Sequence, residues 1–189
     1  MTAYLAPIEQ PQGLRLKLVY FLSRRRFGSV PTPISVFSSR VPAQFLSFFG
    51  KVSKLDKKLV LPASTARIVR EQVARTNSCL FCVDIARWDA MKRSPEDVTR
   101  MDALAEYRTS PLFSDAERAA LDYASELTIS KHVEPETFDR LARFYSEREI
   151  CEIVWLVASE HLYNMSNHGL NIGSDGLCQL RAERLSASR

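Results

Sequence analysis

The sequence predicts an all-α fold, and three observations favour it. The chain of 189 residues has only 6 glycines, well below the usual share of about 7%. Most of its 9 prolines fall between amphipathic stretches rather than inside them. Apolar residues recur at helical spacing, and no alternating apolar and polar run is long enough for a sheet. With 46% hydrophobic residues, the chain is expected to form one domain with a sizeable core, which excludes wholesale disorder.

Two helices are expected near the N-terminus, at about 14–25 and 43–57, on either side of a proline-punctuated connection. Their Leu and Phe side chains need a surface that covers them. Residues 1–60 are therefore interpreted as an N-terminal helical extension that packs onto the remainder, with 61–175 as the core and 176–189 as a C-terminal tail.

The next two helices bracket a short turn. Pro62 is expected in the first turn of a helix that ends near Thr76, because proline is tolerated at that position. Asn77 and Ser78 then offer side-chain oxygens that could cap the start of the following helix.

Three later helices have sharper start signals. Each begins with a serine three residues before an acid, the reciprocal arrangement of a capping box. These starts are at Ser94, Ser114 and Ser146, and the helices are expected to run to about Tyr107, Ser130 and Asn167. Pro135 starts a further helix between the last two.

The charge balance is mildly basic. Lys and Arg number 26 against 22 Asp and Glu, a formal net charge of +4, which is weaker than the concentrated field of a nucleic-acid binder. The cluster at 24–26 is interpreted as a solvated helix end, with a nucleic-acid or membrane contact as the alternative. The sequence has no apolar run of ~18 residues and no signal pattern in 1–12. We therefore expect a cytoplasmic protein with no nucleic-acid or membrane partner.

Cys79 and Cys82 form a C-x-x-C pair at an expected helix start. Residues three apart lie on the same side of the first turn, so the two thiols can meet. The positive end of the helix dipole favours a thiolate there, and the neighbouring thiol can resolve a sulfenic acid into a disulfide. The pair therefore favours redox chemistry, with a structural pair or a zinc site as alternatives. Zinc needs two more ligands, and no second close Cys or His pair exists. Cys151 lies in an apolar run and is expected to be buried.

The segment 73–84, VARTNSCLFCVD, resembles the core signature of the carboxymuconolactone decarboxylase and AhpD-like alkylhydroperoxidase superfamily. The segments 113–121, 145–150 and 162–167 are similar to its recurring helix starts and its closing helix. The resemblance covers roughly residues 30–175. It implies an AhpD-like helical bundle, here with an N-terminal helical extension, assembled into a homo-oligomer such as a trimer, a hexamer or a dimer.

The resemblance also implies a chemistry. In peroxidase-type members a cofactor-free dithiol reduces organic hydroperoxides, and a dithiol or thioredoxin-like donor returns the electrons. Cys82 would be the peroxidatic cysteine and Cys79 the resolving one. The positions of the usual Glu and His proton relay hold Arg67, Phe81 and Ala86 in this chain. Turnover is therefore expected to be slow unless other residues supply the proton.

Two residues could replace the missing relay. Glu71 follows Arg67 by one helical turn and points the same way, closer to the cysteines. The alternative is an exposed stripe in which Arg67, Glu71 and Arg75 form ion pairs. On the last helix, His161 with Asn164 could act as the acid–base group, or the two could bond to one another or to a neighbouring subunit.

The predicted catalytic residues are therefore Cys79, Cys82, Glu71 and His161, with no metal and no cofactor. Two other functions stay open. One is a carboxymuconolactone decarboxylase-like lyase, although decarboxylation needs no dithiol. The other is a catalytically decayed family member that acts as an oligomeric or partner-binding protein, which the loss of three relay positions motivates.

Overall fold

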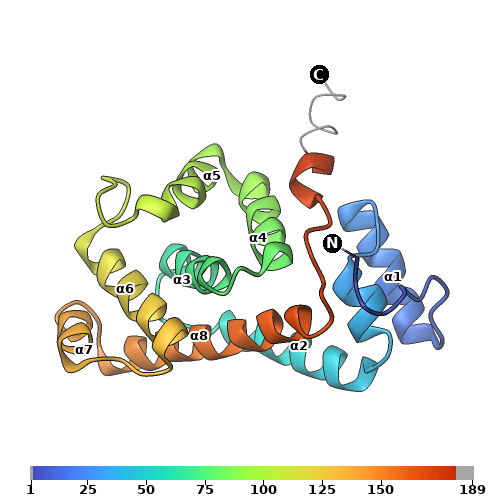
Figure 1. Ribbon diagram of the computed structural model, residues 1–189, viewed down its shortest axis with the longest axis horizontal. Helices are drawn as coiled ribbons and strands as arrows, with labels where there is room; N and C mark the ends of the chain where they lie inside the picture. The colour runs from blue at the N-terminus through green and yellow to red at the C-terminus, as the bar shows by residue number, and fades with distance from the viewer. Residues whose placement is uncertain (1, 182–189) are drawn as a thin grey trace.

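The computed structural model describes residues 2–181 and shows an all-helical molecule (Figure 1). No strand occurs among these residues, which confirms the predicted fold class. The labelled helical elements are α1 (Leu14–Phe27), the π-helical turn η1 (Ile34–Ser38), α2 (Pro42–Asp56), α3 (Ala63–Thr76), α4 (Leu80–Arg93), α5 (Pro95–Asp102), the 3₁₀ turn η2 (Ala103–Glu106), α6 (Asp115–Ser130), α7 (Pro135–Ala142) and α8 (Glu147–His168), and residues 177–181 are helical as well.

The predicted serine caps are present. Ser114 at α6 and Ser146 at α8 form complete capping boxes with Glu117 and Glu149. Ser94 makes the first bond of a box, since its hydroxyl accepts the backbone N–H three residues on. The helix that starts there was expected to reach residue 107, but its α-helical part ends at residue 102 and a 3₁₀ turn continues it.

The start of α4 differs from the prediction. Cys79 itself occupies the N-cap position, and no side chain caps the helix. Ser78 has a positive φ of 55°, which turns the chain sharply between α3 and α4. The Asn77 side chain does not cap α4, because it donates instead to Asn164 on α8. The turn is closed by a bond from the Cys79 backbone N–H to the Ala74 carbonyl oxygen, at 2.9 Å.

The main core lies where α3 packs against α6 and α8 (Figure 1). Its fully buried side chains include Val69 and Val73 from α3, Ala120 and Ala124 from α6, and Ile153 and Leu156 from α8. The small alanines of α6 allow its backbone to approach α3 closely. The core therefore leaves the other side of α3 free to face α4.

A second cluster covers α4 from outside. Phe81 and Trp88 of α4 pack with Phe27 and Val36 of the N-terminal region and with Ile172 and Leu177 of the C-terminal segment. In Figure 1 this segment runs from the end of α8 between α4 and α1. Both ends of the described chain thus meet on one helix, the helix that carries the cysteine pair.

Asp84 fixes the C-terminal segment to α4. Its buried carboxylate accepts hydrogen bonds from the Ser174 hydroxyl and from the backbone N–H groups of Leu177 and Cys178, at 2.8–3.0 Å. Burial alone would raise the pKa of Asp84, but these bonds outweigh it and lower the pKa. The tail expected at 176–189 is thus attached to α4 at its start, and its part from residue 182 onward lies outside the described residues.

Cys151 is exposed and free, so the prediction of a buried thiol is wrong. The residues of α8 that face the core are Ile150, Ile153, Leu156 and Val157, at helical spacing. Cys151 follows the first of them by about 100° around the helix, which places it on the outer side.

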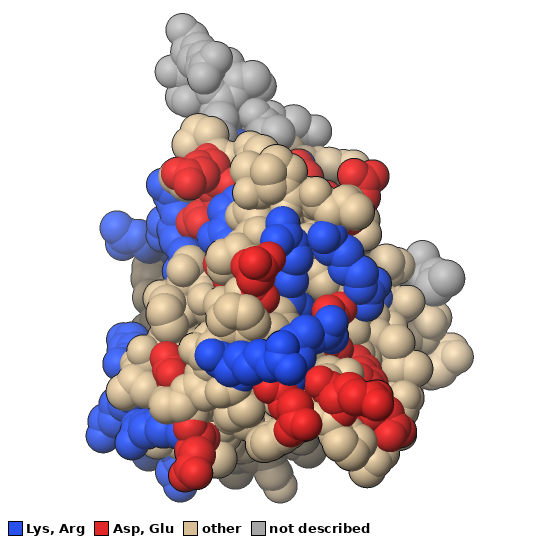
Figure 2. Space-filling model, turned by 90° about the vertical axis from the view of Figure 1, so that its left-hand side faces the viewer, with Lys and Arg blue, Asp and Glu red and all other residues tan. Residues whose placement is uncertain are grey.

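Charges of both signs lie side by side on the face that Figure 2 shows. On α6, Glu117 pairs with Arg100 at 2.6 Å, and Asp122 pairs with both Arg108 and Arg140 at 2.8 and 2.9 Å. Among residues 2–181, no helix combines the length and the hydrophobicity needed to cross a membrane.

We predict that Asp84→Ala weakens the fold, because three buried or half-buried donors lose one charged acceptor. The free energy of unfolding should fall by about 2 to 4 kcal/mol. Urea denaturation followed by circular dichroism measures this change. Asp139→Ala, at an exposed position of α7, is the control. Equal stability of the two variants would contradict the anchoring role.

Candidate active site

Cys79 and Cys82 form a disulfide at the start of α4, with their Cα atoms 5.3 Å apart. The structure therefore brings together the two cysteines that the sequence singled out. Cys79 is 1% exposed and Cys82 is 6% exposed. The pair packs against Ala74 of α3 and against Val83 and Tyr163.

Asn164 on α8 binds the sulfur of Cys82. Its side-chain Nδ2 donates to Cys82 Sγ at 3.1 Å and to Glu160 Oε1 at 2.8 Å. Its Oδ1 accepts from Asn77 Nδ2 at 2.8 Å. These three bonds use both amide hydrogens and the oxygen, so the fully buried amide has one defined orientation.

Asn167, one turn further along α8, contacts both sulfurs. Its Nδ2 lies 3.4 Å from Cys82 Sγ and 3.5 Å from Cys79 Sγ. Asn167 is also buried. Cys82 therefore has two amide donors within hydrogen-bond distance, whereas Cys79 has one.

Glu160 belongs to a buried network behind Asn164. Arg70 of α3 donates to Glu160 Oε2 at 3.5 Å and to Asp56 Oδ2 at 2.7 Å. Trp155 Nε1 donates to the other oxygen of Asp56 at 3.1 Å. Burial raises the pKa of Glu160, while the positive charge of Arg70 opposes the rise. The network ties α2, α3 and α8 together beside the cysteine pair.

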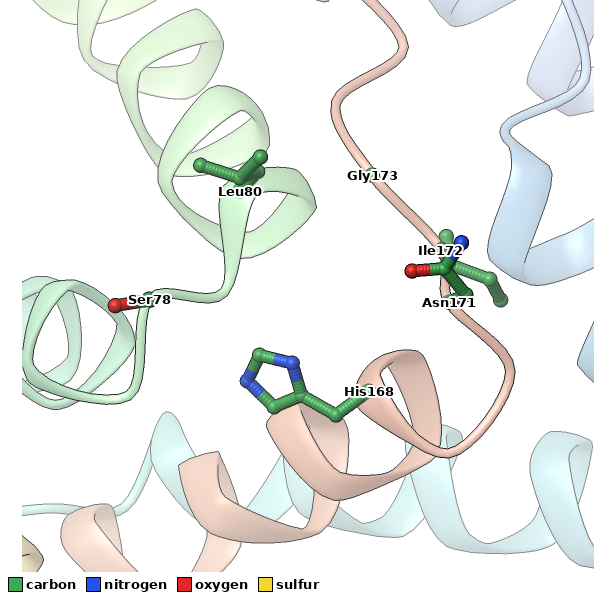
Figure 3. Close-up of a pocket in the computed structure, with 6 residues that line it drawn as sticks. All are labelled: Ser78, Leu80, His168, Asn171, Ile172 and Gly173. Carbon is green, nitrogen blue, oxygen red and sulfur yellow. The ribbon is translucent and has the colours of Figure 1, made fainter. Parts of the chain in front are cut away.

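A cavity of about 290 Å³ lies between the start of α4 and the segment that follows α8 (Figure 3). It is lined by residues from the start of α4, the end of α8 and the segment that follows, namely Ser78, Leu80, His168, Asn171, Ile172 and Gly173. Two of these residues flank Cys79 in the sequence, and His168 follows Asn167. His168 Nε2 lies 2.8 Å from the Asn77 carbonyl oxygen. Cys79 and Cys82 are themselves buried, and neither lines the cavity.

The chain is similar to known proteins over most of its length. The uncharacterized protein YnjA of Escherichia coli (strain K12) is 31% identical over 170 residues, which are 87% of this chain and 90% of YnjA. The chain belongs to the same family as YnjA. No family model matches it.

Two solved structures resemble this YnjA-family chain closely in fold. A cysteine-to-alanine variant of the debrominase Bmp8, in complex with 2,3,4-tribromopyrrole, has a TM-score of 0.79 at 23% identity and covers 96% of each chain. An alkylhydroperoxidase AhpD core protein from Ralstonia eutropha JMP134, named as peroxidase-related, has a TM-score of 0.70 at 19% identity and covers 93% of this chain and 94% of that one. The AhpD-like fold predicted from the sequence is thereby confirmed.

Glu71 of this YnjA-family chain is buried, with 1% of its surface exposed. Its Oε1 accepts from Arg75 Nε at 2.7 Å, and its Oε2 has no hydrogen-bond partner among the described residues. Burial raises its pKa to about 7, and Glu160 adds to the rise, while Arg75 opposes it. The ion pair with Arg75 that the sequence suggested is present. The expected stripe of Arg67, Glu71 and Arg75, however, is buried at Glu71. Ala74, one turn on, packs against the cysteines, so Glu71 lies on the cysteine-facing side of α3.

Three residues, Arg67, Phe81 and Ala86, replace those of the usual proton relay, and their surroundings differ. Arg67 pairs with Asp97 of α5 at 3.5 Å. Phe81 is buried against Trp88 and the N-terminal region, where a histidine would lie among apolar side chains. For Ala86 nothing in the structure explains the residue.

His161 lies on a different side of α8 from the sulfur contacts. Its Nε2 is 3.4 Å from Thr128 Oγ1 on α6, and burial together with the nearby Lys131 lowers its pKa. Asn164 bonds to Asn77, Glu160 and Cys82 and not to His161. The structure thus brings Cys79, Cys82 and Glu71 to one region and places His161 elsewhere; its catalytic role stays a prediction.

Sequence reasoning missed Glu160, Asn167 and His168 as site residues. A signal existed, because residues 160, 164 and 167 follow one another at steps of four and three and share one helix face. Choosing this face over the face of His161 requires knowing which face of α8 packs toward the cysteines. Within residues 2–181, no group of three or more His, Cys, Asp and Glu side chains is arranged to hold a metal ion.

We predict that Glu71 makes stability depend on pH. Its raised pKa means that ionisation is disfavoured in the folded state. As the pH rises from about 4.5 to about 7, the fold should lose up to about 3 kcal/mol relative to a variant without this titration. Urea unfolding of wild type and Glu71→Gln over this window measures the difference. Glu106→Gln, at an exposed position, should keep the wild-type slope, and a wild-type slope in Glu71→Gln would contradict the assignment.

Proposed function

We propose that the protein is a cofactor-free dithiol oxidoreductase that reduces hydroperoxides through Cys79 and Cys82. The observation that carries the proposal is the disulfide at the start of α4, within reach of amide donors. Ser78 and Leu80, the sequence neighbours of Cys79, line a cavity. Two thiols that can bond to one another can also cycle between reduced and oxidised forms. The peroxidase-related neighbour of the same fold supports this reaction class.

The reaction balances without a cofactor. The Cys82 thiolate attacks one oxygen of ROOH, so the O–O bond breaks, an S–O bond forms, and the alkoxide takes a proton to leave as ROH. The Cys79 thiol then attacks the sulfenic acid, which forms the disulfide and releases water. A dithiol donor, thioredoxin-like in chemistry, returns two electrons and two protons and is itself oxidised to a disulfide.

Glu71 is the proposed proton source for the leaving alkoxide. With a pKa of about 7 it is partly protonated near neutral pH, which suits a general acid. Its Oε2 has no hydrogen-bond partner among the described residues. A single buried carboxyl in place of a Glu and His relay supports a slower turnover.

We further propose that the protein is cytoplasmic and assembles as a homo-oligomer. The support for the homo-oligomer is the outer face of α1, where Leu14, Leu18, Phe21 and Leu22 are all more than half exposed at helical spacing. Such a face gains free energy when another surface covers it.

Reductive dehalogenation is the second candidate, favoured by the TM-score of 0.79 to the debrominase Bmp8. The same dithiol can supply the electrons. Two thiols and a carbon–bromine bond become a disulfide, a carbon–hydrogen bond and hydrogen bromide. The nature of the substrate distinguishes the two candidates.

We predict that the reduced protein consumes an organic hydroperoxide in the presence of a dithiol, and that Cys82→Ser abolishes this activity. Cys79→Ser should retain a single turnover, because Cys82 can still form a sulfenic acid, which dimedone traps. Cys151→Ser, which removes an exposed thiol elsewhere on the chain, should behave as wild type.

Assays of the same variants with other substrates separate the alternatives. Debromination of 2,3,4-tribromopyrrole without peroxide consumption would favour the second candidate. A lactone-directed or decarboxylating activity that survives full thiol alkylation would favour a lyase. Peroxide consumption that persists unchanged in Cys82→Ser would overturn the proposal.

A further inference from the structure

We propose that Asn164 and Asn167 are catalytic residues whose side-chain amides stabilise the thiolate of Cys82, so that two neutral hydrogen-bond donors activate the nucleophile. The inference rests on the proposed function for its substrate. It also explains from contacts why Cys82, rather than Cys79 at the N-cap, is the attacking sulfur.

The donor geometry distinguishes the two cysteines. Cys82 Sγ lies 3.1 Å from Asn164 Nδ2 and 3.4 Å from Asn167 Nδ2. Cys79 Sγ has only the longer contact with Asn167, at 3.5 Å. A thiolate can only accept hydrogen bonds, so donors aimed at a sulfur favour its charged form. The first turn of α4 adds its free N–H groups to the same effect.

The orientation of the Asn164 amide is fixed from three sides. Asn77 donates to its oxygen, and Glu160 accepts from its nitrogen, both at 2.8 Å. A flipped amide would direct its oxygen at Glu160 and at Cys82, two acceptors, and its nitrogen at the Asn77 donor. Arg70 in turn holds Glu160. The donor is therefore in place before the thiolate forms, as electrostatic preorganisation requires.

No charged side chain hydrogen-bonds either sulfur among the described residues. From α3, Glu71 is paired with Arg75. From α8, Glu160 bonds to Asn164, and His168 bonds to the Asn77 carbonyl oxygen. On α4, Asp84 accepts from the C-terminal segment, and Arg87 pairs with Asp102. The two amides are thus the side-chain groups that hydrogen-bond the nucleophile.

Burial makes these amides important. Asn164 is 0% exposed and Asn167 is 4% exposed, so water does not replace them easily around the sulfur. Without these donors, burial would raise the pKa of the Cys82 thiol, and only a small fraction of the thiol would be ionised at neutral pH.

The experiment measures the thiol pKa of Cys82 without any peroxide. Fully reduced protein is alkylated with iodoacetamide across a pH series, and mass spectrometry of peptides follows each cysteine separately. The variants are Asn164→Leu, which removes the donor at similar volume, Asn164→Asp, which replaces it with an acceptor, and Asn167→Leu. Ser166→Ala, between the two asparagines in the sequence but with its hydroxyl bonded to the Leu162 carbonyl oxygen instead of a sulfur, is the matched control.

Asn164→Leu is expected to raise the thiol pKa of Cys82 by about one to two units, with a smaller rise for Asn167→Leu and the largest for Asn164→Asp. The second-order rate with a hydroperoxide at neutral pH should fall about tenfold or more in step with the thiolate fraction. Ser166→Ala should leave both quantities unchanged.

Two results would overturn the inference: an unchanged thiol pKa of Cys82 in asparagine variants that thermal unfolding shows to be folded, or a lower pKa at Cys79 than at Cys82 in the wild type. Should one asparagine variant fail to fold, the other gives the answer. If the pKa shifts appear but wild type consumes no hydroperoxide, the role of the amides stands and the proposed function fails.

Discussion

The buried amide of Asn164 joins three parts of the molecule, namely the turn between α3 and α4, the middle of α8 and the sulfur of Cys82. A polar group with no exposed surface must have its bonding capacity satisfied within the protein. The start of α4 and the face of α8 are therefore held at hydrogen-bond distance from one another. The neighbourhood of the disulfide, including the approach of Asn167, depends on this constraint.

α3 makes a polar site compatible with an apolar bundle. One of its faces carries Val69 and Val73 into the main core. Outside this face, Arg70 and Arg75 pair with buried acids on α8 and on α3 itself. Burying a carboxylate is costly unless a cation or donors compensate it. Glu71 is compensated at one oxygen only, and this incomplete pairing leaves it able to titrate near neutral pH.

The sequence signals that succeeded were local ones. A serine three residues before an acid marks a helix start regardless of the rest of the fold, and Ser114 and Ser146 behave accordingly. Two cysteines three apart at a helix start can meet for the same reason. The predictions for His161 and Cys151 depended on the orientation of α8. Packing against α3, α4 and α6 sets this orientation, and neighbours in the sequence do not. Asn77 was assigned a capping role because its long-range partner on α8 is not visible in the sequence.

Trp88 is one of two tryptophans in the chain, and it is buried where both chain ends meet α4. The ring centroids of Phe27 and Trp88 are 4.7 Å apart. The guanidinium groups of Arg26 and Arg181 each lie 5.2 Å from the centroid of the Trp88 ring. Indole fluorescence is sensitive to nearby cations and to water. Its emission spectrum therefore offers an intrinsic optical signal for detachment of either terminus, one that needs no label and leaves every thiol of the protein untouched.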